Sequence, residues 1–373
     1  VHMSRGLGDV YKRQEYIISI LALNKIGAIG VLINTSLTGA PLVHCINSSD
    51  SKKCIIGAEL AAPLEGVLNE INVTDKSNIY WVKDGENYSC PSWASDLDTL
   101  LDESEKQTPK EIGNVTAKDT AFYIFTSGTT GVPKAALFPN TKIVAASTNI
   151  TKAGYRMNNE DCLYNCLPLY HSTGLMLGLC ACIHVGASTF IRRKFSASAF
   201  WKEAQKFNTT AFVYVGELCR YLSFQEECEE EKSNPISKMV GNGLRPDLWD
   251  CFRNRFKVER ICEIYGASEG NGMFMNLLNK DQTIGMTNVD LALLEYDVAE
   301  DKLKVDENGK YIEVQEHQPG LALVKIGPNA VYNGYTDKKA SEEKVITNVF
   351  EEGDRWFNTC LLYTSPSPRD MWT

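Results

Sequence analysis

Short apolar runs alternate with helix-like stretches along most of this chain. In residues 15–33, EYIISILALNKIGAIGVLI, helical apolar spacing gives way to a β-branched run, which predicts a helix followed by a buried strand. Compact β-rich runs then recur at residues 54–56, 79–82, 121–125, 189–192, 211–215 and 260–264. Helix-like stretches such as residues 198–207 lie between them, and this alternation is typical of parallel sheets with helices on both faces.

The pattern changes after about Gly285. The later runs LALLEYD, KLKVDENGKYIEV and GLALVKI are short and separated by polar turns, and the sequence ENG at residues 307–309 predicts a hairpin. We therefore expect an α/β region at residues 15–285 that contains two parallel-sheet subdomains. A small, mainly antiparallel β unit is expected at residues 286–359.

The charge of the chain argues against nucleic-acid binding. The sequence contains 38 Lys and Arg against 47 Asp and Glu, which gives a formal charge of −9. It also contains no run of basic residues that would bind a nucleic-acid phosphate backbone without regard to base sequence. The 12 cysteines form no paired CxxC arrays, so we interpret them as buried thiols in a reducing compartment. An acidic chain that binds a phosphate compound must concentrate its positive charge locally.

One uncharged stretch raises the question of a membrane span. Residues 162–191 contain no Asp, Glu, Lys or Arg. Asn165, Pro168, two histidines and several glycines interrupt the stretch, so a buried strand, a loop and a helix are the preferred interpretation.

A polar, glycine-rich loop follows directly on the apolar run at residues 121–125. It reads TSGTTGVPK from Thr126 to Lys134, and its hydroxyls, backbone N–H groups and lysine ammonium are donors that suit a polyphosphate. It is not a Walker A loop, because GxxxxGK[ST] is absent, and the structural alternative is a plain surface turn. The candidate phosphate-binding residues are Thr126, Ser127, Gly128, Thr129, Thr130, Gly131 and Lys134.

This loop, together with YGASE at residues 265–269, resembles the signature motifs of the adenylate-forming (AMP-binding) superfamily. The family has threonine where Ser268 stands, so the hydroxyl is kept. The resemblance implies that Tyr265 lies against the adenine, that Gly266 and Ser268 line the nucleotide, and that Glu269 holds Mg²⁺ on the phosphates. The catalytic residues it implies are Thr126, Lys134 and Glu269.

Two further segments resemble loops of the same family. GNGLR at residues 241–245 is similar to the loop that passes the nucleotide base, and its implied nucleotide contacts are Gly241, Asn242 and Gly243. LPLYHSTG at residues 167–174 is similar to the substrate-side motif, and the implied acyl-site residues are Tyr170, His171 and Gly174. A histidine on an apolar background is more often a core residue, and this alternative stays open for His171.

Three stretches narrow the resemblance to the fatty-acid transport protein, or very long-chain acyl-CoA synthetase, branch. They are INTSLTGAPLVHCI, GNGLRPDLW and EIYGASEGN, at residues 33–46, 241–249 and 263–271. The branch implies the large N-terminal α/β domain of an adenylate-forming enzyme, with a fatty acid, ATP, Mg²⁺ and coenzyme A as reaction components. It also implies membrane association with a cytosol-facing site at the endoplasmic reticulum, peroxisome or plasma membrane, not secretion.

The ends of the chain depart from this pattern. The family continues after Thr359 with glycine and an aspartate that holds the ribose, whereas Cys360 and Leu361 stand here. We interpret residues 1–14 and 360–373 as non-native tails and expect the family's C-terminal domain to be missing, with poor turnover as the consequence. The alternatives are a ligase for an aryl or medium-chain acid, a non-catalytic fatty-acid-binding or transport protein, and an inactive fragment.

Overall fold

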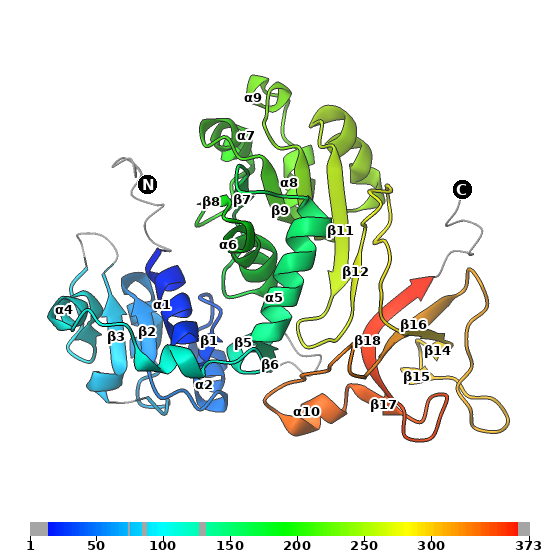
Figure 1. The fold of residues 1–373 in the computed structure, drawn as a ribbon, viewed down its shortest axis with the longest axis horizontal. Helices are drawn as coiled ribbons and strands as arrows, with labels where there is room; N and C mark the ends of the chain where they lie inside the picture. The colour runs from blue at the N-terminus through cyan, green and yellow to red at the C-terminus, as the bar shows by residue number, and fades with distance from the viewer. Residues whose placement is uncertain (1–13, 74, 84–87, 127–131, 365–373) are drawn as a thin grey trace. The chain divides into compact units, whose positions relative to one another are not determined.

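The computed structural model describes residues 14–73, 75–83, 88–126 and 132–364 (Figure 1). Contacts divide the chain into two compact units. The first contains the residues up to 264 and residues 276–285, and the second contains residues 265–275 and those from 286 onward. The sequence predicts a single boundary at residue 285. In the structure the chain also crosses between the units after residues 264 and 275, because residues 265–275 belong to the smaller unit.

The N-terminal part of the first unit begins with the predicted helix and strand. Helix α1 (Gln14–Lys25) leads into β1 (Gly30–Leu32), which pairs in parallel with β5 (Thr120–Thr126). Strand β5 then pairs with the antiparallel β6 (Lys134–Pro139), so this small sheet is mixed. Because β5 and β6 are neighbours, the loop between them begins and ends at one edge of the sheet.

A second small sheet lies in the same part of the chain and is parallel throughout. It consists of β2 (Cys54–Gly57), β3 (Ile79–Val82) and β4 (Ser95–Asp96). Ile79 and Trp81 on β3 are buried against residues of helix α2 (Gly39–Ser48) in one apolar cluster. The remaining short helices here are η2 (Ala58–Leu60), α3 (Ala61–Glu65), η3 (Lys76–Asn78), α4 (Leu97–Glu103) and η4 (Lys110–Asn114).

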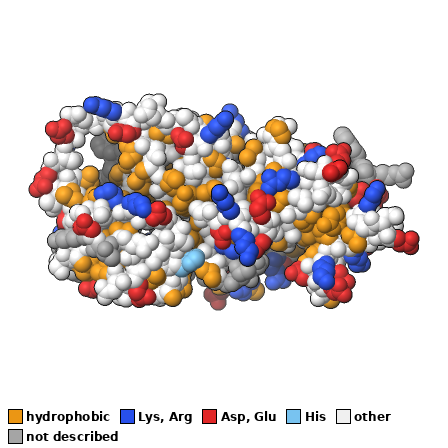
Figure 2. Space-filling view, turned by 90° about the horizontal axis from the view of Figure 1, so that it is seen from below, with side chains coloured by type: hydrophobic (Ala, Val, Ile, Leu, Met, Phe, Trp, Pro, Cys, Tyr) orange, Lys and Arg blue, Asp and Glu red, His pale blue; other side chains and the backbone are white. Residues whose placement is uncertain are grey.

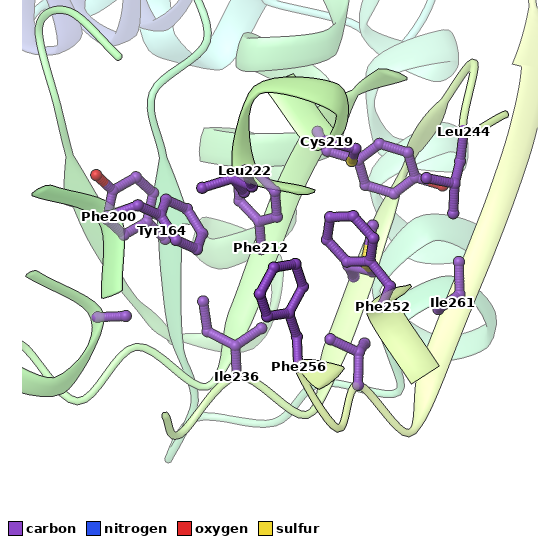
Figure 3. Packing of buried hydrophobic residues seen from close by; sticks show 14 of the residues in the cluster. Tyr164, Phe200, Phe212, Cys219, Leu222, Ile236, Leu244, Phe252, Phe256 and Ile261 are labelled. Atoms are coloured by element: carbon purple, nitrogen blue, oxygen red, sulfur yellow. The ribbon is translucent and has the colours of Figure 1, made fainter. Parts of the chain in front are cut away.

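The largest sheet of the first unit is parallel, as the alternating pattern predicts. Its five parallel strands, in spatial order, are β11 (Arg260–Gly266), β10 (Lys238–Asn242), β9 (Ala211–Val215), β7 (Cys162–Asn165) and β8 (Ser188–Ile191), and the short β12 (Met273–Met275) pairs with β11 as the sixth strand. One face carries α7 (Ala197–Lys206) and α8 (Gly216–Ser223), whose apolar residues join Tyr164, Phe212 and Ile261 in one core (Figure 3). The other helices on or near the sheet are α5 (Asn140–Asn149), η5 (Ile150–Tyr155), η6 (Thr173–Cys180), α6 (Ala181–Val185), α9 (Glu229–Lys232), η7 (Pro246–Leu248) and η8 (Cys251–Arg255).

The uncharged stretch at residues 162–191 folds into part of this layered structure. Strand β7, helices η6 and α6, and strand β8 account for it, and Leu163, Leu175 and Cys182 are buried. The interpretation as a strand, a loop and a helix is confirmed. No helix in the described ranges is long and apolar enough to cross a membrane.

The second unit is built on an antiparallel sheet, as expected. Its strand order is β13 (Leu291–Leu294), β16 (Pro319–Lys325), β18 (Arg355–Thr364) and β17 (Val345–Thr347), with Leu294 and Leu323 fully buried. The smaller elements are β12 (Met273–Met275), β14 (Tyr296–Asp297), β15 (Lys302–Leu303) and α10 (Lys338–Glu342). The predicted hairpin is confirmed, because the Asp306 amide donates to the Lys310 carbonyl at 2.8 Å and Gly309 has a φ of +78°.

Strand β18 runs past the point where the sequence ended the folded unit. Strand β18 continues to Thr364, with Leu362 paired to Leu321 on β16, and the interpretation of residues 360–373 as a non-native tail stays a prediction. The register shifts between Leu321 and Leu323, and Cys360 has a φ of +57° within this irregularity. A cysteine in the left-handed region carries strain that glycine would not.

Replacing Cys360 with glycine is expected to raise the free energy of unfolding by about 1 kcal/mol. The left-handed conformation costs a non-glycine residue about 1–2 kcal/mol, which the extra freedom of glycine in the unfolded chain partly offsets. The Lys344 ammonium also donates to the Cys360 sulfur at 3.0 Å. Cys360→Ala is the control, because it removes the sulfur but keeps the backbone strain. If denaturant unfolding showed the same increase in the free energy of unfolding for both variants, loss of the sulfur, and not relief of strain, would be the cause.

Candidate functional site

The expected phosphate loop is held at both ends by paired strands. Thr126 ends β5, Lys134 begins β6, and the two residues are register partners, with the Thr126 hydroxyl 3.5 Å from the Lys134 carbonyl oxygen that accepts from it. Pro133, next to Lys134, accepts from the His44 imidazole Nε2 at 2.9 Å. The loop residues Ser127, Gly128, Thr129, Thr130 and Gly131 lie outside the described residues.

The expected base loop lies at the carboxyl end of β10 and contains closely packed glycines. A Cβ on Gly241 would overlap the Tyr214 carbonyl, and a Cβ on Gly216 would overlap the Gly243 carbonyl. Both Cβ–oxygen distances would be well below 3.0 Å, the shortest separation that real Cβ atoms show. Gly243 also has a φ of +82°, which favours glycine. The start of α8 therefore touches this loop directly, and Asn242 is the exposed last residue of β10.

A buried carboxylate that the sequence interpretation did not single out supports the same loop. Glu263 on β11 is 5% exposed and accepts from the backbone N–H groups of Gly243 and Leu244 and from the Tyr214 hydroxyl. Burial raises the pKa of Glu263 to about 7, although the three donors act in the opposite direction. The available signal was an acid inside the apolar run RICEIYG, where a strand buried on both faces has no place for an unpartnered charge.

We expect Glu263 to make the stability of the first unit fall as pH rises. Its pKa is about 7 in the folded chain and near 4.5 when exposed, so between these values the folded state binds more protons than the unfolded state. The free energy of unfolding then declines across this window by about 2–3 kcal/mol. Urea unfolding of the wild type and Glu263→Gln at several pH values checks this, and parallel pH profiles for the two proteins would contradict it.

The expected acyl-site segment follows β7 and is anchored by a buried amide. The Asn165 side chain donates to the Gly174 carbonyl at 2.9 Å and accepts from the Leu167 amide at 3.1 Å. A Cβ on Gly174 would clash with the Pro168 carbonyl, so this turn has no room for a larger residue. Tyr170 is half-buried on the same turn. Helix η6, which contains Gly174, contacts both β9 and β10.

His171 is exposed, so the alternative of a buried core histidine is wrong. Its Nδ1 accepts from the Thr173 amide at 3.3 Å, which places the proton of the neutral ring on Nε2. The surrounding protein lowers the pKa of His171 below its ordinary value of 6.5 by desolvation. A neutral, exposed imidazole on this turn is suited to line a substrate surface.

In the second unit, Tyr265 is fixed by a hydrogen bond and a ring contact. Its hydroxyl donates to the Thr359 carbonyl at 2.9 Å, and its ring meets Phe274 edge to face with centroids 6.0 Å apart. Thr359 is itself held, because its hydroxyl donates to the Ala322 carbonyl at 2.7 Å. Gly266 is exposed and Ser268 is half-buried on the same turn.

Glu269, at the end of that turn, is a half-buried carboxylate beside Tyr332. Burial and the negative charge of Glu269 raise the pKa of Tyr332 to about 12, and the Tyr332 hydroxyl donates to the Ser341 carbonyl at 3.1 Å. Within the described part of the chain, no hydrogen bond or ion pair engages the Glu269 carboxylate, and no cluster of three metal-ligating side chains occurs. One unpaired carboxylate suits a hard cation whose other ligands are phosphate oxygens and water.

Several of the predicted site residues lie where strands end. In the first unit, Thr126, the segment beginning at Leu167, and Gly241–Gly243 lie at or just beyond the carboxyl ends of β5, β7 and β10. Ligands of open α/β sheets bind outside these ends. The second unit groups the YGASE turn with Thr359, and Leu361 follows on β18 where the related enzymes are expected to carry the ribose ligand.

Curated relatives match most of this chain in sequence. Medium/long-chain-fatty-acid–CoA ligase FadD6 of Mycobacterium tuberculosis is 38% identical over 95% of this chain and 58% of its own length. Long-chain fatty acid transport protein 6 of Mus musculus is 33% identical over 96% of this chain and 59% of its own length. The chain thus spans less than two thirds of these curated relatives.

Solved structures agree with the fold. An anthranilate CoA ligase, AuaEII, in complex with anthranoyl-AMP matches with a TM-score of 0.76 at 19% identity, over 95% of this chain and 64% of that one. ATP-bound MatB from Rhodopseudomonas palustris matches with a TM-score of 0.74 at 18% identity, over the same shares. The family model described as AMP-binding enzyme matches residues 10–335. The chain belongs to the AMP-binding enzyme family.

Proposed function

We propose that the protein is a ligase that joins a long-chain or very long-chain fatty acid to coenzyme A through an acyl-AMP intermediate. The observation that carries this proposal is the register pairing of Thr126 with Lys134, which closes a Ser/Thr/Gly-rich loop at the carboxyl end of a buried strand. The names of the relatives, a fatty-acid–CoA ligase and a fatty acid transport protein, support the acid class.

In the first half-reaction, a carboxylate oxygen of the acid bonds to the α-phosphorus of ATP and pyrophosphate leaves. Negative charge grows on phosphate oxygens, and the Lys134 ammonium would stabilise it from the start of β6. The Thr126 hydroxyl would add a second donor once its O–H turns from the Lys134 carbonyl to a phosphate oxygen. Mg²⁺, when bound, supplies further charge neutralisation, and Glu269 is the residue that would hold it. Tyr265, fixed by Thr359, would offer its ring to the adenine.

In the second half-reaction, the thiol sulfur of coenzyme A bonds to the acyl carbon, its proton is lost, and AMP leaves. The turn at residues 167–174 would line the acyl group through Tyr170, His171 and Gly174, held by Asn165. Each methylene of the acid that leaves water contributes about 0.8 kcal/mol, which favours long chains wherever apolar surface is available.

Membrane association near a cytosol-facing site is part of the same proposal, because long-chain acids partition into bilayers. The named fatty acid transport proteins support it. Nucleic acid is not an expected partner: on the face shown in Figure 2, basic side chains are interspersed with acidic ones and form no continuous basic area.

One observation favours a second candidate, a protein that binds fatty acid without turning it over. Leu361 stands where the family is expected to hold the ribose with an aspartate, and leucine offers no acceptor for ribose hydroxyls. The two candidates differ in nucleotide affinity and in pyrophosphate release, and each of these two properties can be measured.

The test is the affinity for ATP with Mg²⁺, measured by calorimetry, together with acid-dependent exchange of pyrophosphate into ATP. Acids of increasing chain length serve as substrates, and benzoate serves as the aryl control. Exchange that grows with chain length supports the ligase. Fatty-acid binding without ATP binding would favour the non-catalytic candidate, and preference for benzoate would move the substrate class.

A further inference from the structure

Three neighbouring parallel strands are tied together at their carboxyl ends by one side chain. The Glu263 carboxylate, on β11, meets Tyr214 near the end of β9 and the backbone just beyond the end of β10. Leu244 donates to both carboxylate oxygens, at 3.1 Å and 3.3 Å. The Gly243 amide also donates to Oε1, which is the oxygen that accepts the shorter bond from Leu244.

We propose that Glu263 is a positioning residue for nucleotide binding: its carboxylate fixes the backbone of Gly243 and Leu244 in the conformation that accepts the adenine. This inference rests on the proposed function, because it takes residues 241–245 as the loop that passes the base. Glu263 itself is buried beneath the loop, so its effect is transmitted through the two backbone amides.

The glycines around the loop explain why such a tie is needed. Gly243 is left-handed, and its carbonyl lies so close to Gly216 that a Cβ there would overlap it. Glycine has the widest backbone freedom of any residue, so a loop with two of them keeps one conformation only if other groups impose it. Two charge-assisted hydrogen bonds, each about twice as strong as a neutral one, supply that constraint.

The ionised carboxylate makes this tie strongest. A protonated acid still offers its carbonyl oxygen to Gly243 and Leu244, but it loses the charge and turns its O–H toward the Tyr214 oxygen. The titratable groups that face Glu263 are Tyr214 on β9, Cys219 on α8 and Cys262 on β11, and no Lys or Arg in the described ranges pairs with it. With a pKa of about 7, Glu263 changes its charge near neutral pH.

The test measures adenosine affinity between about pH 5.5 and about pH 8.5, because adenosine carries no group that titrates in this range. Wild-type affinity is expected to fall about tenfold toward the acid end. Glu263→Gln, which mimics the protonated acid, is expected to show the acid-limit affinity at every pH. Tyr214→Phe keeps the carboxylate but removes a donor that lowers its pKa, so the midpoint of the pH profile should move upward.

A matched control exists in the same sheet. The Tyr164 hydroxyl donates to the Glu203 carboxylate, which is also paired with Arg192, and none of these bonds involves the backbone of residues 241–245. Tyr164→Phe therefore removes a similar Tyr–Glu bond and is expected to leave the pH profile of adenosine affinity unchanged.

The outcomes separate the inference from the proposed function. If the wild type binds ATP and adenosine but Glu263→Gln shows the same pH profile as the wild type, the positioning role is overturned while the ligase proposal stands. If Tyr164→Phe shifts the profile as much as Tyr214→Phe, the effect belongs to the sheet and the positioning role is also overturned. If the wild type binds neither ATP nor adenosine, the proposed function fails and the positioning role fails with it.

Discussion

Replacing Gly216 with alanine is expected to lower the free energy of unfolding by at least about 3 kcal/mol. The added Cβ would overlap the carbonyl oxygen and carbon of Gly243, and both atoms are backbone, so no side-chain rotation relieves the contact. Overpacking of this kind costs about 1–3 kcal/mol where flexible side chains can yield, and more where backbone must move. Denaturant unfolding of the purified variant measures the loss as a lower midpoint at unchanged slope.

The same substitution at an open glycine is the control for Gly216→Ala. Gly57 ends β2 with a φ of −74°, and nothing lies within 4 Å of a Cβ built there. Gly57→Ala is therefore expected to be neutral or to stabilise by about 0.4–1 kcal/mol. Equal stability of Gly216→Ala and the wild type would mean that the contact between α8 and the loop at 241–245 relaxes freely, and that the glycines there are not required by packing.

The sequence located most strands of the first unit because burial on both faces leaves a plain signal. The runs at 211–215 and 260–264 became β9 and β11, and the run at 79–82 became β3, each with an almost continuous apolar pattern. Where several short β-rich runs alternate with helices, the parallel arrangement follows from chain connectivity. The strand order, however, depends on pairings between distant residues and could not be predicted.

The candidate site likewise contains residues that could be predicted from the sequence and residues that could not. Thr126 and Lys134 could be named from sequence because residue types and spacing carry the chemistry, and the β5–β6 pairing then places them together. Glu263 was missed because its donors, Tyr214, Gly243 and Leu244, are 19 to 49 residues away along the chain. An acid in a short apolar run gives no local sign of which distant groups will satisfy it.

The last residue of β18 could not be located from the sequence alone, for a physical reason as well. Residues 360–364, CLLYT, are of types that occur in strands, and β18 continues through them by pairing with β16 as far as Pro319. The left-handed Cys360 absorbs the register shift between the two strands. Which strand this short run pairs with depends on residues far away in the sequence.

Replacing Glu269 with glutamine is expected to slow acid-dependent pyrophosphate exchange by about 10²–10³-fold. The carboxylate is half-buried and has no hydrogen bond or ion pair within the described ranges, so its negative charge is available to a cation on the phosphates. Glutamine keeps the size and one oxygen but not the charge, and losing a group that stabilises developing phosphate charge costs about 3–4 kcal/mol. The exchange rate is measured across a range of Mg²⁺ concentrations.

The dependence on Mg²⁺ distinguishes a metal-holding role for Glu269 from a structural one. The variant should need a much higher Mg²⁺ concentration for half-maximal exchange, and the pKa of Tyr332 should fall, because the charge of Glu269 helps to raise it. Glu295→Gln is the matched control, since Glu295 lies in the same unit with a side chain 33% exposed and pairs with Lys304. A carboxylate that holds the ion cannot lose its charge without weakening the binding of the ion to ATP. If Glu269→Gln showed a normal exchange rate and a normal Mg²⁺ requirement, Glu269 would therefore not be part of the nucleotide site.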